Sequence, residues 1–220
     1  MSAGRGRECL FSALLCVFVL AGAAWSGDSE IVRNFKNARL QNDEYRMQYI
    51  VEKNKEKIPD EIKALVDMAT ASGATGEDKK ENFYTAELLA TSYKDLFGDV
   101  EPIRGVKRRY FDSLLGPPAR SISQDGVHAV EMPQSADPMK NVLVPDNIII
   151  KRGETVRFVN KATATHILAS MPLISEGGLF SPDIEPGQNW RYKFEKAGVY
   201  YYFCFIHRSM IGKITVEDAE

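Results

Sequence analysis

The chain has 220 residues, of which 28 are Lys or Arg and 30 are Asp or Glu, so its formal net charge at pH 7 is −2. This length accommodates one large domain or two small ones. The near-neutral charge excludes the broad basic surface that nucleic-acid binding requires, and no nucleic-acid partner is expected.

The N-terminal segment has the three parts of a secretory signal peptide. Arg5 and Arg7 precede an apolar run at 10–25, and small residues at 21, 23, 24 and 26 offer cleavage sites. The run is shorter than the roughly 20 apolar residues of a membrane-spanning helix. We therefore expect residues 1–26 to be removed on export to the periplasm, with no stable membrane span remaining. An uncleaved segment would instead tether the chain to the membrane.

Export would leave a single cysteine in the mature chain. Cys9 and Cys16 lie in the signal segment, so only Cys204 remains. A lone thiol excludes an internal disulfide. It leaves four interpretations: intermolecular pairing, a reactive thiol, a buried inert thiol, or a metal ligand.

Residues 27–116 are predicted to be all helical, because Glu, Lys, Ala and Leu are frequent and β-branched runs are few. About four helices are expected, at roughly 30–57, 58–73, 75–98 and 101–115. The region contains no His and no Cys, which excludes a C-x-x-C-H haem attachment and a Glu-x-x-His di-iron centre. Partner binding and oligomerisation remain open as its role.

Two local features close the helical region. The basic cluster at 107–109 is interpreted as a solvated helix face, with partner docking as the less favoured alternative. Gly116-Pro117-Pro118 and the serines after it mark the linker expected at 117–126.

Residues 127–220 change to short strands separated by turn residues. About seven strands in this length are typical of a two-sheet Greek-key sandwich, so the whole chain is predicted to be α+β. The candidate strands are His128–Met132, Asn147–Lys151, Thr155–Asn160, His166–Ser170, Trp190–Phe194, Val199–Cys204 and Gly212–Glu217.

Cys204, His207 and Met210 recur at three-residue intervals directly after an aromatic run that alternates like a strand. One Cys, two His and a weak axial Met form the ligand set of an electron-transfer copper site. A second histidine must therefore come from elsewhere, and the chain offers only His128 and His166. Zinc remains an alternative, although it prefers harder or fully thiolate ligands to a thioether.

The flanking residues resemble a known family. The run Lys151-Arg-Gly-Glu-Thr-Val-Arg-Phe-Val-Asn160, followed by His166, is similar to the first half of a cupredoxin. The stretch from Pro186-Gly-Gln-Asn-Trp190 to Gly212-Lys-Ile-Thr-Val216 is similar to the second half. Amicyanins share the Cys-x-x-His-x-x-Met spacing, whereas plastocyanins and pseudoazurins have longer loops. The resemblance covers about 127–217 and does not extend to the helices.

This resemblance implies that one copper ion, cycling between Cu(I) and Cu(II), is bound by His166, Cys204, His207 and Met210. His128 lies outside the matched positions and is expected to be a surface or structural residue. Two positions depart from the family pattern: Ile167 stands where many members have Asn, and Ile206 where many have Pro.

The expected function is that of an exported, mononuclear type 1 copper protein that carries single electrons and is not an enzyme. Multicopper oxidases and copper nitrite reductases need more than three histidines. Copper storage or delivery remains an alternative. A red-copper-type redox enzyme is less favoured, because its additional ligand is a carboxylate and this chain has Met210.

The resemblance also implies a docking surface for redox proteins. In related proteins the second histidine of the loop, here His207, reaches the surface through an apolar patch. Ile206, Met171, Pro172 and Leu173 are candidate members of this patch, with ordinary core or loop packing as the alternative.

Overall fold

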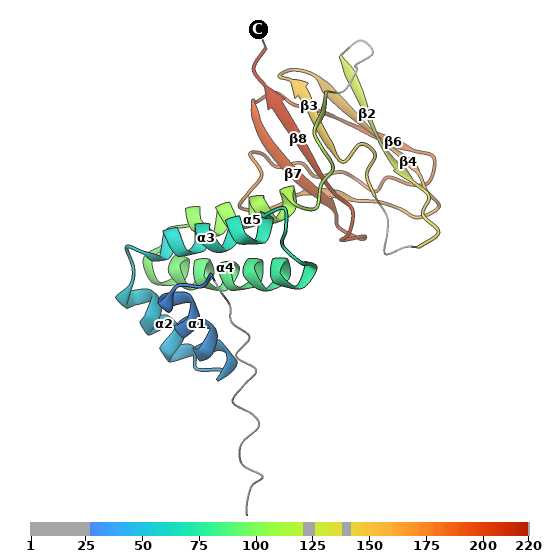
Figure 1. Ribbon diagram of the computed structural model, residues 1–220. Coiled ribbons are helices and arrows are strands. Elements are labelled where there is room, and N and C mark those ends of the chain that lie inside the picture. Colours follow the sequence, from blue (N-terminus) through green and yellow to red (C-terminus); the bar gives the residue numbers. More distant parts are fainter. Residues whose placement is uncertain (1–26, 121–125, 138–141, 220) are drawn as a thin grey trace, which may run out of the picture. The chain divides into compact units, whose positions relative to one another are not determined.

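The computed structural model describes residues 27–120, 126–137 and 142–219. The predicted signal segment at 1–26 lies outside these residues. The described chain is mixed α+β, with five helices followed by strands in two sheets, as predicted (Figure 1). It divides into two compact units, Met1–Ile50 and Val51–Glu220, which are described separately. None of the described helices combines the length and the apolar character that crossing a membrane requires.

The first predicted helix is divided in two, into α1 (Glu30–Leu40) and α2 (Glu44–Lys53). Asn42 adopts a φ of 53°, in the left-handed region that ends helices. The Asp43 carboxylate then accepts the backbone N–H of Arg46, which begins a new helix. The break therefore comes from the Asn-Asp pair, which overrides the helix-forming residues on both sides.

Three helices belong to the second unit: α3 (Ile58–Thr70), α4 (Gly76–Phe97) and α5 (Glu101–Asp112). Gly98 ends α4 with a φ of 75°, as predicted for a C-terminal glycine. The three helices bury one apolar face each, formed by Ile58, Ile62, Leu65, Val66, Ala69, Phe83, Ala86, Leu89, Ala90, Tyr93, Ile103 and Val106.

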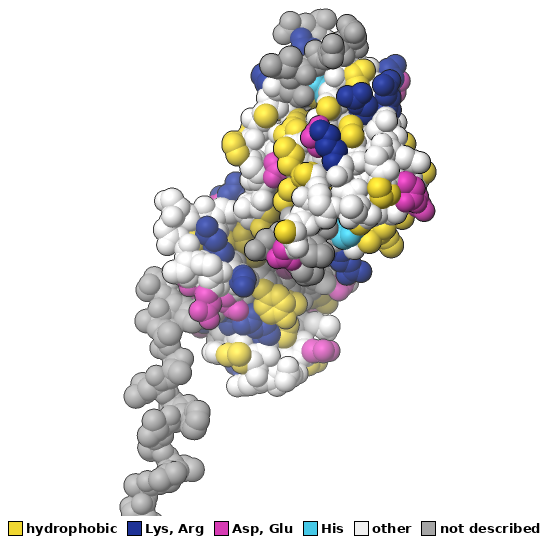
Figure 2. Space-filling model, turned by 90° about the vertical axis from the view of Figure 1, so that its right-hand side faces the viewer, with side chains coloured by type: hydrophobic (Ala, Val, Ile, Leu, Met, Phe, Trp, Pro, Cys, Tyr) yellow, Lys and Arg dark blue, Asp and Glu magenta, His cyan; other side chains and the backbone are white. Residues whose placement is uncertain are grey.

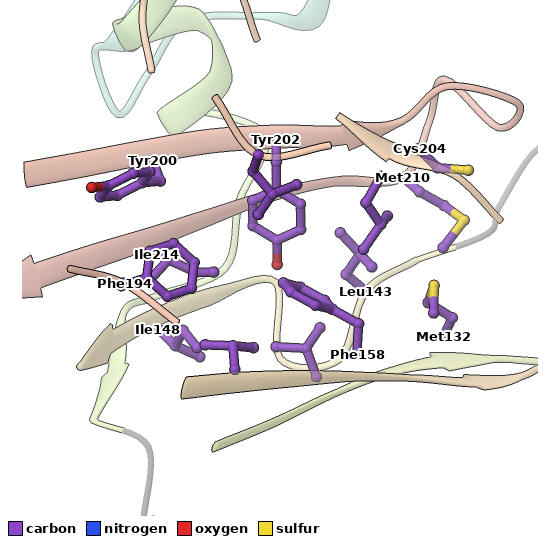
Figure 3. Packing of buried hydrophobic residues seen from close by; sticks show 14 of the residues in the cluster. Met132, Leu143, Ile148, Phe158, Phe194, Tyr200, Tyr202, Cys204, Met210 and Ile214 are labelled. Carbon is purple, nitrogen blue, oxygen red and sulfur yellow. The ribbon is translucent and has the colours of Figure 1, made fainter. Parts of the chain in front are cut away.

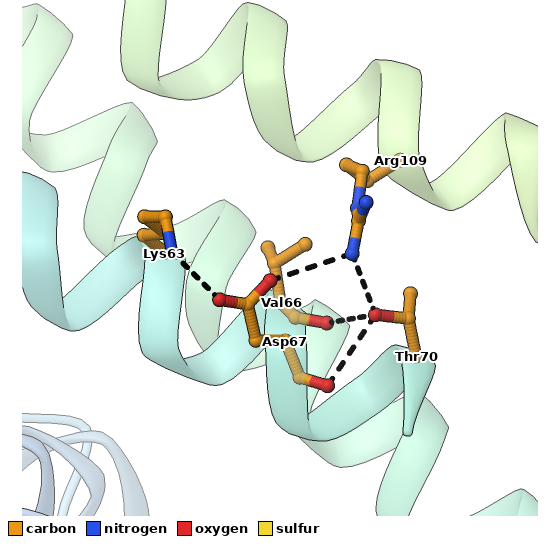
Figure 4. Close-up of polar contacts among 5 residues, drawn as sticks. All are labelled: Lys63, Val66, Asp67, Thr70 and Arg109. Carbon is orange, nitrogen blue, oxygen red and sulfur yellow. Dashed lines mark hydrogen bonds and ion pairs between the residues drawn. The ribbon is translucent and has the colours of Figure 1, made fainter. Parts of the chain in front are cut away.

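The basic cluster at 107–109 is partly exposed, with side-chain exposures of 36% for Lys107 and 52% for Arg109, and both residues also bind partners on other helices. Arg109 of α5 donates to Thr70 at 2.8 Å and lies 3.4 Å from Asp67, both on α3 (Figure 4). Lys107 pairs with Glu87 of α4 at 2.7 Å. The sequence could not reveal these partners, because they lie 20 to 42 residues away in the chain.

The strands form two sheets that enclose a hydrophobic core between them (Figure 3). A five-stranded sheet has the order β1-β3-β8-β7-β5, and a three-stranded sheet has the order β2-β4-β6. The strands are β1 (Ala119–Arg120), β2 (Val127–Pro133), β3 (Asn147–Lys151), β4 (Thr155–Lys161), β5 (Leu168–Ser170), β6 (Asn189–Lys193), β7 (Gly198–Cys204) and β8 (Ile211–Glu217).

Strands β7 and β8 form the antiparallel pair that carries the predicted metal loop. Tyr200, Tyr202 and Cys204 alternate toward the inter-sheet core, whereas Tyr201 lies in a separate cluster on the opposite face of β7. The period of two therefore directs the cysteine into the sandwich, as its sequence spacing predicts.

Candidate metal centre

Cys204 is the last residue of β7 and is fully buried. It lies opposite Leu168 of β5, and the Phe205 N–H donates to the Ile167 carbonyl at 2.7 Å. These contacts hold the end of β7 against the segment that carries His166. Two chain segments 38 residues apart are thereby brought to one end of the sandwich.

His166 precedes β5 and is 1% exposed. Its backbone forms a two-bond bridge with Ile184, at 3.1 and 2.9 Å. Burial, with a smaller contribution from the charge of His207, lowers the pKa of His166 from 6.5 to about 4. The ring is therefore neutral near pH 7, which is the form that donates a lone pair to a metal.

The turn from 204 to 210 is closed by its own backbone. The Cys204 N–H donates to the Met210 carbonyl at 2.9 Å, and the Met210 N–H donates to the His207 carbonyl at 2.9 Å. The His207 N–H donates to the Cys204 sulfur at 3.5 Å. The turn therefore holds the ligand-type side chains near one another by main-chain bonds.

Three ligand atoms meet at this end of the sandwich. The Cys204 sulfur lies 3.6 Å from Nδ1 of His166 and 3.6 Å from Nδ1 of His207, and the two nitrogens are 3.2 Å apart. A point in their plane lies about 2.0 Å from all three atoms, which matches metal–nitrogen bonds and is slightly shorter than a zinc–sulfur bond. The three residues therefore fit one metal ion, and their atoms form a metal-binding group among the described residues.

Comparison with known proteins identifies the family to which the chain is related. Residues 130–217 match the family model of copper binding proteins, plastocyanin/azurin family. The chain is 35% identical over 91 residues to a plastocyanin of Scenedesmus fuscus, covering 37% of this chain and 93% of that protein. It is 34% identical over 101 residues to an amicyanin of Paracoccus versutus, covering 43% of this chain and 75% of that protein.

The chain belongs to the plastocyanin/azurin family of copper-binding proteins. The family binds copper, so the copper cofactor expected from the sequence resemblance is confirmed. The four predicted ligands all lie within the matched residues. A solved purple cupredoxin of Nitrosopumilus maritimus aligns with 40% of this chain and 98% of its own, at 25% identity and a TM-score of 0.36.

Met210, the fourth predicted ligand, is 1% exposed and has its sulfur at the same end of the core as that of Cys204 (Figure 3). Met132 on β2 is also fully buried, and its sulfur faces that of Met210 (Figure 3). The cupredoxin core therefore brings two thioethers toward the buried thiol. From the sequence alone, packing is favoured over copper delivery as the role of Met132, because scattered methionines are more often packing residues.

Asn160 supports the segment before His166, a role that sequence analysis missed. Its buried amide donates to the carbonyls of Ala164 and Ile184, both at 2.8 Å, and its oxygen accepts the Ala162 N–H at 2.9 Å. The side chain of Ile167, at the position where many family members have Asn, cannot form hydrogen bonds. Asn160 on the preceding strand holds the segment before His166 instead. The available signal was an asparagine at the end of a strand, just before a short polar turn.

His128 lies outside the group. It is 2% exposed, and its Nε2 is 2.8 Å from the Glu154 carboxylate. The same carboxylate oxygen accepts the Lys151 N–H at 2.6 Å. His128 therefore has the structural environment that was expected for a histidine outside the matched positions.

Proposed function

We propose that this protein is a mononuclear type 1 copper protein that carries single electrons between redox partners, with His166, Cys204, His207 and Met210 as its copper ligands. The observation that carries the proposal is the group of three ligand atoms, two of them on buried residues, held by backbone hydrogen bonds from two chain segments. Bound copper would supply a Cu(I)/Cu(II) couple at this position.

The burial of the site favours a carrier over an enzyme. Cys204, His166 and Met210 are at most 1% exposed, so within the described part of the chain a substrate could approach the group only past the partly exposed His207. A ligand set fixed by main-chain bonds also changes little when the charge of the metal changes by one. Such burial likewise argues against a storage protein, which must release its metal readily.

His207 offers the route to the surface. It is the partly exposed member of the group, and Phe205 and Ile206 beside it are 61% and 49% exposed. Figure 2 shows one face of the protein, on which hydrophobic side chains lie among Lys, Arg, Asp and Glu side chains. An apolar surface around a ligand edge would allow close approach of a redox partner with little polar desolvation.

The proposal retains the predicted organisation of the chain. Residues 1–26 would direct export to the periplasm, and 127–220 would form the copper-binding domain. Residues 117–126 would link that domain to the helical region at 27–116. Mass spectrometry of the exported protein would locate the cleavage site, and an intact N-terminus would contradict the signal-peptide assignment.

Spectra of the mature protein loaded with Cu(II) test the site. Family resemblance implies an intense visible band from charge transfer between Cys204 and copper, with a matching EPR signal. Cys204→Ser should abolish the band, whereas His128→Gln, which alters a histidine outside the group, should retain it. Absence of the band in the parent protein, or its survival in Cys204→Ser, would refute the assignment.

Two further measurements separate the alternatives. An electron carrier should show a reversible copper couple in voltammetry and resist a copper chelator. A storage or delivery protein should instead lose copper to the chelator within the mixing time.

A further inference from the structure

A groove of about 590 Å³ lies beside the ligand loop and is shared between the loop and α5. Eight of its lining residues are apolar, two are basic and none is acidic, although the whole chain carries more acidic than basic residues. The lining residues are Lys107, Phe111, Met171, Pro172, Leu173, Ile174, Phe203, Phe205, Arg208 and Ile211. The groove thus joins three of the predicted patch residues to a helix that has no counterpart in the family match.

The loop at 171–174 holds Leu173 in an unusual conformation. Its φ is 74°, in the left-handed region that residues with a Cβ rarely adopt, and its side chain is 37% exposed in the groove. Such conformations persist only where surrounding contacts impose them, and they concentrate at functional positions. The loop is held both by α5, through Arg104, and by β7, where the Tyr201 carbonyl accepts the Met171 N–H at 2.8 Å.

Helix α5 is bound to the copper-binding domain along one face. Arg104 donates to the Leu173 carbonyl at 2.8 Å, and Arg108 donates to the Ile174 carbonyl at 3.2 and 3.3 Å. One turn further, Asp112 accepts the Tyr201 hydroxyl at 3.0 Å and the Lys213 ammonium at 2.7 Å. Residues 104, 108 and 112 are spaced by four, so they project from one side of the helix.

The apolar part of the same interface is continuous with these bonds. Met171, Ile174 and Tyr201 form a buried cluster, and Phe111 of α5 and Phe203 of β7 pack against it. Phe203 directly precedes Cys204. The wall of the groove is therefore part of the packing around the ligand strand.

The charges of the groove select the kind of partner that fits it. Arg208, next to His207, is exposed and pairs with no carboxylate in the described part of the chain. Lys107, the other basic lining residue, forms an ion pair with Glu87, so its charge contributes less to the positive potential of the groove. An apolar groove with an excess of positive charge is complementary to an apolar protrusion surrounded by carboxylates.

We propose that α5 and the 171–174 loop extend the electron-transfer surface, and that this groove docks a redox protein with an acidic, apolar contact face. The inference rests on the proposed electron-carrier function and specifies the partner of that site. The helical region then contributes to partner choice through α5, and no role in holding copper is required of it.

Two soluble cytochromes c, one acidic and one basic, serve as probes. Electron exchange with the copper-loaded mature protein is followed by stopped flow at several ionic strengths. The acidic cytochrome should react faster, with a rate that falls as salt is added. Arg208→Glu should slow this reaction roughly tenfold at low salt. Arg191→Glu, an exposed arginine of β6 outside the groove, is the matched control and should change it little.

The apolar contact is tested by Leu173→Asn. Asparagine tolerates the left-handed conformation and removes the apolar tip, so the variant should fold and bind the acidic cytochrome roughly fivefold more weakly. Phe180→Ser removes a side chain that is 70% exposed and does not line the groove, and should leave binding unchanged. NMR of the Cu(I) form should show cytochrome-induced shifts for amides of α5 and 171–174.

The outcomes separate this inference from the proposed function. Without a reversible copper couple in the parent protein, both fail. With that couple present, the docking proposal alone is overturned by equal effects of Arg208→Glu and Arg191→Glu. Equal effects of Leu173→Asn and Phe180→Ser, or faster exchange with the basic cytochrome, would overturn it as well.

Discussion

Gly212 is the position where a single methyl group should most disturb the copper-binding domain. It lies on β8 directly opposite Tyr202 of β7, and the tyrosine ring covers it. A Cβ at 212 would stand 2.5 Å from the Tyr202 hydroxyl, 2.8 Å from Cε1 and closer still to Cζ. The φ of Gly212 is not positive, so its backbone conformation does not require a glycine. The glycine is required by the ring that packs on it.

The ring cannot move aside at low cost. Tyr202 is 1% exposed and makes an edge-to-face contact with Phe158, with ring centroids 5.5 Å apart. Phe158 in turn stacks on Trp190 at 5.6 Å. Overpacking a close-packed core typically costs about 1–3 kcal/mol, and the backbone opposite leaves Tyr202 little freedom. We expect Gly212→Ala to lower the free energy of unfolding by about 2–3 kcal/mol.

Urea unfolding of the metal-free mature protein, followed by Trp190 fluorescence, measures this loss. Trp190 is the only tryptophan after the predicted signal segment, and it contacts the same core. Gly178→Ala is the control, since its added Cβ would meet nothing within 4 Å and its φ is ordinary. The control should be neutral or stabilise by up to about 1 kcal/mol. Equal midpoints for the two variants would refute the packing argument.

Three other outcomes follow from the polar contacts. In the metal-free protein His166 should stay neutral in an NMR titration until about pH 4. Because the pKa of His166 is lower in the folded state than the unfolded value of 6.5, the neutral histidine contributes to stability above pH 6.5, and this contribution is lost as the pH falls toward 4. A titration of His166 near pH 6.5 would contradict the burial of its ring. Asp112→Asn removes the anion that binds Lys213 and Tyr201, and should cost about 1–3 kcal/mol by thermal unfolding; an unchanged Tm would show that these bonds contribute nothing. Asn160→Ala removes the donor to the Ala164 carbonyl, the acceptor of the Ala162 N–H and one of two donors to the Ile184 carbonyl, and should cost about 2–4 kcal/mol by urea unfolding; a loss below about 1 kcal/mol would mean that water replaces the amide.

Local patterns in the sequence were sufficient to predict much of the structure of the copper-binding domain. Alternation along β7 identifies the face on which Cys204 lies, and the three-residue spacing places His207 and Met210 in one turn. His166 could be selected over His128 only through the family resemblance. Its approach to the loop depends on pairing between residues 38 positions apart, which no local pattern specifies.

Long-range polar contacts explain what the sequence could not reveal. In the sequence, Asn160 cannot be distinguished from an ordinary strand residue, and only the structure reveals its hydrogen bonds to the carbonyls of Ala164 and Ile184. The sequence predicts only a surface charge for Arg108, because the carbonyl to which it donates lies 66 residues away in the chain. The break between α1 and α2 has a local cause, but an Asn-Asp pair inside a long helical pattern competes with many helix-forming neighbours.

Helix α5 connects three other parts of its unit through consecutive residues. Lys107 binds Glu87 on α4, Arg108 binds the 171–174 loop, and Arg109 binds α3. The proposed ligand atoms, in contrast, are held by main-chain bonds within 204–210 and by the bridge at His166, none of which involves α5. A change in α5 should therefore alter the groove and its partner without altering the copper spectrum. This separation allows partner choice to vary by substitution in a helix while the copper site stays the same.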